Sequence, residues 1–291
     1  MLEFQARLPN TIPTSLPVYR LGPDATAISD AGVQLSMLAQ RLGMKGRAHE
    51  SLRSDDWSLH REESWELGVH GRSGAIVGRR EGQYLRGSDA TFDLNDDRAS
   101  EIASSFLRRT AIAPVREMRL RGVTHLRTAG GDERANVGRE EILDAGVVIG
   151  RSVNGTEVDG PGGAAMVNVD ATGEVVGFRC IWRPVGESMG RVKIIDPEIA
   201  QRGLTAIANR VRGDVLVTKA SFGYFEQGMM DRQDYLQPAF VFVYVVRDDE
   251  VSYRSVEVVA ASERTHELLQ GEKRFPVKRK TRRRLEVTTD R

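Results

Sequence analysis

The sequence predicts an α+β protein built from repeated units, each consisting of one helix on an antiparallel sheet. Helical patterns begin near residues 30, 95 and 196, and each is followed by segments with the alternation typical of strands. One amphipathic helix can cover the apolar face of an antiparallel sheet, which makes a stable two-layer unit. We therefore expect two αβββ-type units preceded by a partial one.

The chain divides on this basis into five parts. Residues 1–24 contain four prolines and are expected to form an extended N-terminal arm. The partial unit spans 25–92, and the two full α+β units span 93–190 and 191–262. Residues 263–291 form a basic C-terminal tail.

Three helices are expected from apolar stripes and end signals. The first spans about 30–42 and ends before Gly43, a typical helix stop. The second spans 95–109, with acidic residues in its first turn that suit the helix dipole. The third spans 196–211, where Asp196 is a candidate N-cap.

The strands are expected to pair with their sequence neighbours in antiparallel fashion. Asn154-Gly155 is the strongest short hairpin signal, because both residues tolerate the positive φ of a type I′ turn. The glycine-rich segment 160–163 should join two strands rather than cradle a phosphate, which normally requires a strand followed by a helix. The expected strands span 64–70, 75–80, 115–127, 146–153, 156–159, 165–170, 174–183, 215–224, 238–246 and 252–261.

Composition limits the class of protein. The 291 residues are 40% hydrophobic and 29% charged with a net charge of +1, which indicates a globular chain without overall attraction to nucleic acid or anionic membranes. No apolar run approaches the roughly 18 residues of a membrane span, and the N-terminus lacks the pattern of a signal peptide. The sequence as it stands indicates a soluble, cytoplasmic protein, or an extracytoplasmic one if a signal peptide had been removed.

No catalytic, metal-binding or cofactor motif stands out. The five histidines have no metal-ligand spacing, and His60 beside Glu62 is expected in a solvated loop. Cys180 is the single cysteine, which excludes an internal disulfide, and it is expected to be a buried, unreactive thiol. We therefore predict no catalytic residues, no metal site and no cofactor.

A family resemblance lies in the hairpin region. The segment Asn154-Gly155-Thr156-Glu157-Val158, followed by Val167-Asn168-Val169-Asp170-Ala171-Thr172-Gly173-Glu174-Val175, resembles the PepSY and YycI/YycH-like superfamily. It is also similar to the propeptide modules of thermolysin-type proteases. The resemblance implies a helix-on-sheet fold and a regulatory or inhibitory binding role at or outside the cell surface.

Two segments are candidate binding surfaces. The loop 227–237 carries apolar residues suited to contact with another protein or a second subunit: Met229, Met230, Tyr235 and Leu236. The tail carries a cationic run that either binds an anionic partner or is a solvated tail: Lys278, Arg279, Lys280, Arg282, Arg283 and Arg284.

Three functional hypotheses follow. The leading one is a non-catalytic protein-interaction or regulatory module, self-assembling or inhibitory. The first alternative is a small-molecule-binding α+β enzyme, similar to a cyclase or isomerase, with a pocket that needs no motif. The second alternative is binding of an anionic polymer through the tail. A deep apolar pocket containing an isolated Asp, His or Tyr would favour the enzyme, whereas a flat sheet with an exposed aromatic patch would favour the binding module.

Overall fold

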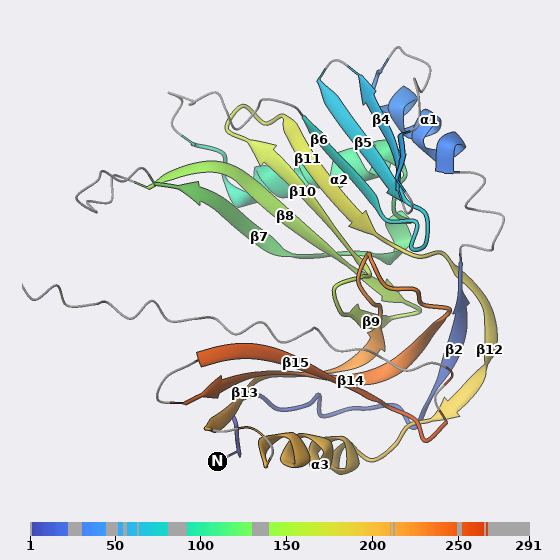
Figure 1. The fold of residues 1–291 in the computed structure, drawn as a ribbon, viewed down its shortest axis with the longest axis vertical. Coiled ribbons are helices and arrows are strands. Elements are labelled where there is room, and N and C mark those ends of the chain that lie inside the picture. The colour runs from blue at the N-terminus through green and yellow to red at the C-terminus, as the bar shows by residue number, and fades with distance from the viewer. Residues whose placement is uncertain are drawn as a thin grey trace, which may run out of the picture. The chain divides into compact units, whose positions relative to one another are not determined.

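The computed structural model is an α+β fold dominated by antiparallel strands (Figure 1). It describes residues 2–22, 31–44, 52–54, 57–62, 64–80, 92–129, 140–209, 211, 213–248, 252–264 and 266. The chain forms two compact units. Unit 1 comprises Met1–Leu16, Lys193–Phe222 and Ala239–Arg291, and unit 2 comprises Pro17–Val192 and Gly223–Pro238.

Unit 2 contains a long antiparallel sheet. The strands pair in the order β7-β8-β10-β11-β6-β5-β4-β3, and each of these pairs is antiparallel. Because β11 pairs with β6, the predicted parts 25–92 and 93–190 share one sheet and lie in one unit. The bounds are β3 Leu52–Ser54, β4 Trp57–Glu62, β5 Trp65–His70, β6 Ile76–Arg80, β7 Met118–Thr128, β8 Glu141–Val153, β10 Ala164–Asp170 and β11 Val175–Ile181.

Two helices share the core of this sheet. Helix α1 (Ala31–Arg41) packs on β4 and β5, and helix α2 (Asp96–Thr110) crosses β7, β8, β10 and β11. Asn95 caps α2 by accepting a hydrogen bond from the backbone of Arg98, which satisfies an N–H that the helix leaves unpaired. The buried side chains of both helices and of the sheet form one hydrophobic cluster. Both helices lie within one or two residues of their predicted positions.

The Asn154-Gly155 hairpin forms as expected. Both residues have positive φ, at 49° and 82°, and the turn joins β8 to β9 (Thr156–Asp159). The glycine-rich segment 160–163 then joins β9 to β10, as predicted.

Unit 1 places helix α3 (Pro197–Ala208) against β15 (Ser252–Ala260). Asp196 accepts a hydrogen bond from the backbone of Glu198, so its predicted role as N-cap is confirmed. Strand β14 (Tyr235–Arg247) pairs antiparallel with β15, and β13 (Asp214–Phe225) pairs in parallel with β1 (Leu2–Phe4). The middle of β14 is apolar on both faces and correspondingly buried on both.

The N-terminal arm is more regular than predicted. It contains β1 and β2 (Ser15–Leu21), and β2 pairs with β14 through Tyr19 and Leu236. Strand β12 (Val185–Lys193), which neighbours β2, was also missed, because its sequence has two glycines and only three scattered apolar residues, and most of its residues are exposed.

The expectation of a solvated loop at His60 was wrong. His60 lies in β4 and is only 2% exposed, because it occupies a core-facing position opposite Leu67. Among the residues that the structure describes, no helix has the length and apolarity that crossing a membrane requires.

Candidate functional site

The predicted protein-binding residues do not form one exposed patch. Leu236 is fully buried, because it lies in β14 and pairs with Tyr19 of β2, so its assignment to a binding surface was wrong. Tyr235 begins the same strand and is half-buried. Met230 is 58% exposed, and Met229 beside it is partly exposed. The six cationic tail residues from Lys278 to Arg284 lie outside the described residues.

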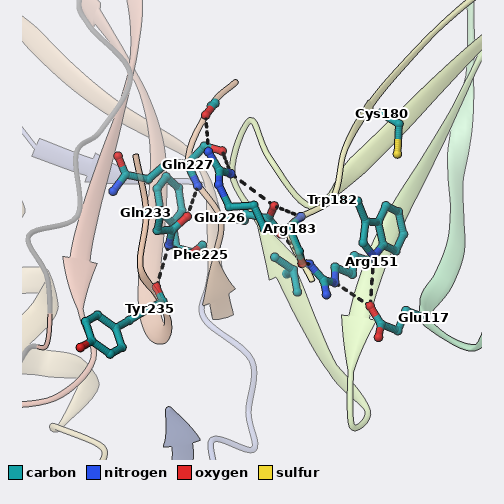
Figure 2. Close-up of polar contacts among 12 residues, drawn as sticks. Glu117, Arg151, Cys180, Trp182, Arg183, Phe225, Glu226, Gln227, Gln233 and Tyr235 are labelled. Atoms are coloured by element: carbon teal, nitrogen blue, oxygen red, sulfur yellow. Dashed lines mark hydrogen bonds and ion pairs between the residues drawn. The ribbon is translucent and has the colours of Figure 1, made fainter. Parts of the chain in front are cut away.

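A buried arginine holds the loop that presents Met230. The guanidinium of Arg183 donates hydrogen bonds to three carbonyl oxygens of the loop, those of Gln227, Gly228 and Asp231, at 2.7–2.8 Å. Figure 2 shows Arg183 beside Glu226 and Gln227 of this loop. We call residues 226–234 the clamped loop, because these bonds fix its path from inside the protein.

Gln233 closes the clamped loop on its other side. Its side-chain oxygen accepts a hydrogen bond from the backbone of Gln227 at 2.7 Å. Its amide nitrogen donates to the carbonyl oxygens of Phe225 and Tyr235 at 2.8 and 2.9 Å (Figure 2). Buried polar groups of the loop are thus paired, as a stable irregular segment requires.

An ionic network continues from the loop into the sheet. Glu226, which is fully buried, accepts hydrogen bonds from Arg151 at 2.8 Å and from the backbone and guanidinium of Arg183 at 3.0 and 3.3 Å. Arg151 also binds Glu117 at 2.8 Å, and its guanidinium lies 5.3 Å from the ring centre of Trp182. Trp182 in turn donates to Glu117 at 3.0 Å (Figure 2). The charges of two buried arginines and two buried glutamates therefore balance one another.

The glycine-rich segment completes this assembly. Gly162 donates its backbone N–H to the carbonyl oxygen of Glu226 at 3.0 Å. A Cβ atom at Gly160 or Gly162 would collide with backbone carbonyl oxygens of the clamped loop. The glycines are thus required for close approach of two backbones rather than for binding a phosphate. We interpret the whole network as structural, because its charges are already paired with each other.

A separate apolar pocket of about 530 Å³ lies in unit 2. We call it the Trp182 pocket; its walls include Met37, Leu38, Ile76, Ile112, Trp182 and Val185. Its polar side chains are Gln34, Arg41 and Thr110, and the described residues that line it include no Asp, Glu, His or Tyr. Its volume lies within the range of about 300–1,000 Å³ found for small-molecule sites.

Cys180 also lines the pocket, and its thiol is protonated. Burial raises the pKa of its thiol to about 12, so the thiol stays protonated at neutral pH. The predicted burial of this thiol is confirmed. Across the described part of the chain, no three His, Cys, Asp or Glu side chains gather in a way that could hold a metal ion.

Among the described residues that line the pocket, Arg41 is the one with a cationic group. It donates a hydrogen bond to the carbonyl oxygen of Thr110 at 2.6 Å, which fixes the guanidinium between the ends of α1 and α2. The Thr110 hydroxyl donates to the carbonyl oxygen of Phe106 at 2.8 Å. The pocket therefore combines apolar walls with a positioned cation.

Comparisons with known proteins indicate the fold alone. No family profile and no curated protein sequence matches this chain. The fold resembles the crystal structure of an uncharacterized protein from Eubacterium rectale, with a TM-score of 0.52 and 12% sequence identity. The match covers 92% of this chain and 91% of that chain.

Proposed function

We propose that this chain is a non-catalytic binding module whose ligand is a small apolar molecule with a carboxylate end. The observation that carries the proposal is the Trp182 pocket, in which Arg41 lies at the edge of apolar walls. Apolar walls with a few placed polar groups are typical of small-molecule sites. A guanidinium matches a carboxylate in both charge and geometry.

The same pocket favours binding over catalysis. General acid–base chemistry needs a titratable group within hydrogen-bond reach of the substrate. The described lining offers the guanidinium of Arg41, which is a donor without an acceptor, and the neutral thiol of Cys180. These groups can hold and orient an anion but are poorly suited to moving a proton.

Titration calorimetry with decanoate and decanol tests this proposal. We expect decanoate to bind more tightly than decanol. The variant Arg41→Met should lower the affinity for decanoate about tenfold, which corresponds to the loss of one charge-assisted hydrogen bond. Decanol binding should change little, because the methionine keeps the apolar stem. Ile112→Trp, which fills the pocket, should abolish binding of both compounds.

Arg116→Met is the matched control, because the Arg116 side chain is 87% exposed and does not line the pocket. Its affinities should equal those of the unmodified protein. Decanoate binding that survives both Arg41→Met and Ile112→Trp would refute the assignment of the pocket, and so would the absence of binding by either compound.

The clamped loop supports a second candidate function, contact with a second copy of the chain. Binding surfaces gain affinity when the loop that carries them is ordered before binding. The bonds from Arg183 and Gln233 supply that order, and Met230 is the exposed apolar side chain of the loop. Self-association through this loop would agree with the leading hypothesis of a protein-interaction module.

Sedimentation velocity at rising protein concentration tests the second candidate. Met230→Glu should weaken self-association at least about tenfold, as expected for a contact residue at the centre of an interface. Met189→Glu is the control, since Met189 is 42% exposed but lies on β12. A protein that stays monomeric throughout, or equal effects of both variants, would rule out this surface.

The finer architectural expectations remain proposals. Helix α2 followed by β7 and β8, and α3 followed by β13, β14 and β15, support an origin of both segments in one repeated helix-on-sheet unit. The likeness to PepSY-type modules rests on the sequence around Asn154-Gly155, which forms a hairpin of the expected kind. A regulatory or inhibitory role would be compatible with ligand binding in the Trp182 pocket.

A further inference from the structure

A second cavity of unit 2 carries a different chemistry from the Trp182 pocket. It has a volume of about 670 Å³ and lies along the exposed face of α2, opposite the end of β6 and the turn before β11. Among the described residues, four arginines and two glutamates line it, an excess of two positive charges: Arg80, Arg98, Arg108, Arg109, Glu101 and Glu174. We call this cavity the arginine groove.

The two glutamates are already neutralised by two of the arginines. Arg98 binds Glu101 at 2.9 Å on α2, and Arg80 forms an ion pair with Glu174 across the groove. Arg80 also lies 5.6 Å from the ring centre of Trp65, and its Nε is buried without a hydrogen-bond acceptor. Arg80 is thus engaged with Glu174 and Trp65, and its charge does not contribute to the excess of the lining.

The other two arginines have no carboxylate partner among the described residues. Arg108 donates a long hydrogen bond of 3.4 Å to the hydroxyl of Ser105, and Arg109 lies 5.9 Å from the ring centre of Phe106. Both belong to the last turn of α2, where cations also complement the helix dipole. Both side chains line the groove, so each guanidinium can donate hydrogen bonds to an anion bound there.

The floor of the groove is apolar. Ile102, Phe106 and Val175 line it beneath the charged side chains. An organic group attached to the anion would therefore be buried against these residues, which adds affinity in proportion to the apolar area removed from water.

We propose that the arginine groove binds a small phosphomonoester, with the phosphate on Arg108 and Arg109 and the organic part on the apolar floor. A phosphomonoester carries a charge of about −1.5 to −2 at pH 7, which matches the excess positive charge of the lining. Its oxygens accept paired hydrogen bonds from guanidinium groups. The site is separate from the Trp182 pocket, so this inference stands or falls independently of the proposed function.

Phenyl phosphate, phenyl sulfate and inorganic phosphate are the probes, measured by titration calorimetry at low salt. Phenyl phosphate should bind most tightly, because phenyl sulfate has one charge less and inorganic phosphate lacks the apolar group. Affinity for phenyl phosphate should fall as the pH drops below about 6, where the phosphate becomes a monoanion. Binding of phenyl sulfate should not follow that pH dependence.

Charge variants test the location. The double variant Arg108→Gln/Arg109→Gln should lower the affinity for phenyl phosphate about tenfold, which is the loss expected when partly exposed charge-assisted hydrogen bonds are removed. Glu101→Gln, which removes a negative charge and releases Arg98, should instead tighten binding about twofold to threefold. Arg116→Gln, an exposed arginine outside the groove, should change nothing.

Opposite effects of removing cations and removing an anion distinguish a ligand site from arginines that only complement the helix dipole. If Arg108 and Arg109 serve the dipole alone, their double variant lowers the melting temperature while phenyl phosphate binds no more tightly than phenyl sulfate. That result would overturn the proposal. The absence of binding at millimolar probe, or identical affinities for all variants, would overturn it as well.

Discussion

Replacement of Glu226 by glutamine should destabilise the protein by about 3 kcal/mol or more. Glu226 is fully buried and accepts hydrogen bonds from both Arg151 and Arg183. The glutamine keeps the shape of the side chain but removes its negative charge. Glu117 is then the one buried carboxylate of the network that remains to balance the charges of Arg151 and Arg183. Removing one partner of a buried ion pair costs about 3–5 kcal/mol, because the remaining charge is left uncompensated in the interior. Chemical denaturation measures the loss as a change in the free energy of unfolding.

An ion pair on the same loop provides the control. The Arg232 side chain is 77% exposed and binds Asp234 at 3.1 Å, so Arg232→Gln should change the free energy of unfolding by less than about 1 kcal/mol. Glu226→Gln should also loosen the clamped loop, and trypsin should then cleave faster after Arg232. Similar stability losses in the two variants would mean that the buried network contributes no more than a surface pair.

Local signals in the sequence were sufficient for the helices and the tightest hairpin. Asn95 and Asp196 are N-caps whose side chains bond backbone N–H groups within three residues, so neighbouring residues alone determine them. The same holds for Asn154-Gly155, whose turn needs positive φ at two consecutive residues. Such features depend on short stretches of chain, and a sequence pattern records them directly.

The clamped loop and its network could not be located in this way. Arg183 and Glu226 are 43 positions apart, and Glu117 and Arg151 are 34 apart, so their meeting depends on strand pairing that no local pattern specifies. One signal was available. Arg151 lies within an apolar strand and Arg183 follows Ile181-Trp182, and a charged residue at such a position requires a partner. The signal indicates that a partner exists but not which residue it is.

The Trp182 pocket could not be predicted from the sequence for a related reason. The Trp182 pocket is lined by residues from α1, the end of α2, β11 and the start of β12, and β12 itself was not predicted. The misassignment of Leu236 has the same cause, since β2 covers it and the N-terminal arm was expected to be irregular. Sequence reasoning treated 227–237 as one loop, whereas pairing with a distant strand makes its end part of the core.

Gly160→Ala should be about as damaging as the loss of Glu226, and the mechanism is steric. Gly160 has a φ of 112° and lies so close to the clamped loop that a Cβ would collide with the carbonyl oxygen of Glu226 and approach Phe225 to 2.9 Å. Backbone strain at positive φ costs about 1–3 kcal/mol, and overpacking adds about 1–3 kcal/mol. The sum should appear in chemical denaturation as a loss of about 3 kcal/mol or more.

Gly190→Ala separates the two contributions. Gly190 has a φ of 102°, close to that of Gly160, but a Cβ there would meet nothing within 4 Å. Its alanine variant should therefore lose only the strain part, about 1 kcal/mol or slightly more. The difference between the two variants measures how tightly the glycine-rich segment is pressed against the clamped loop. Equal losses of the free energy of unfolding would show that the clamped loop moves to accommodate the added methyl group. The loop would then be more flexible than its hydrogen bonds from Arg183 and Gln233 indicate.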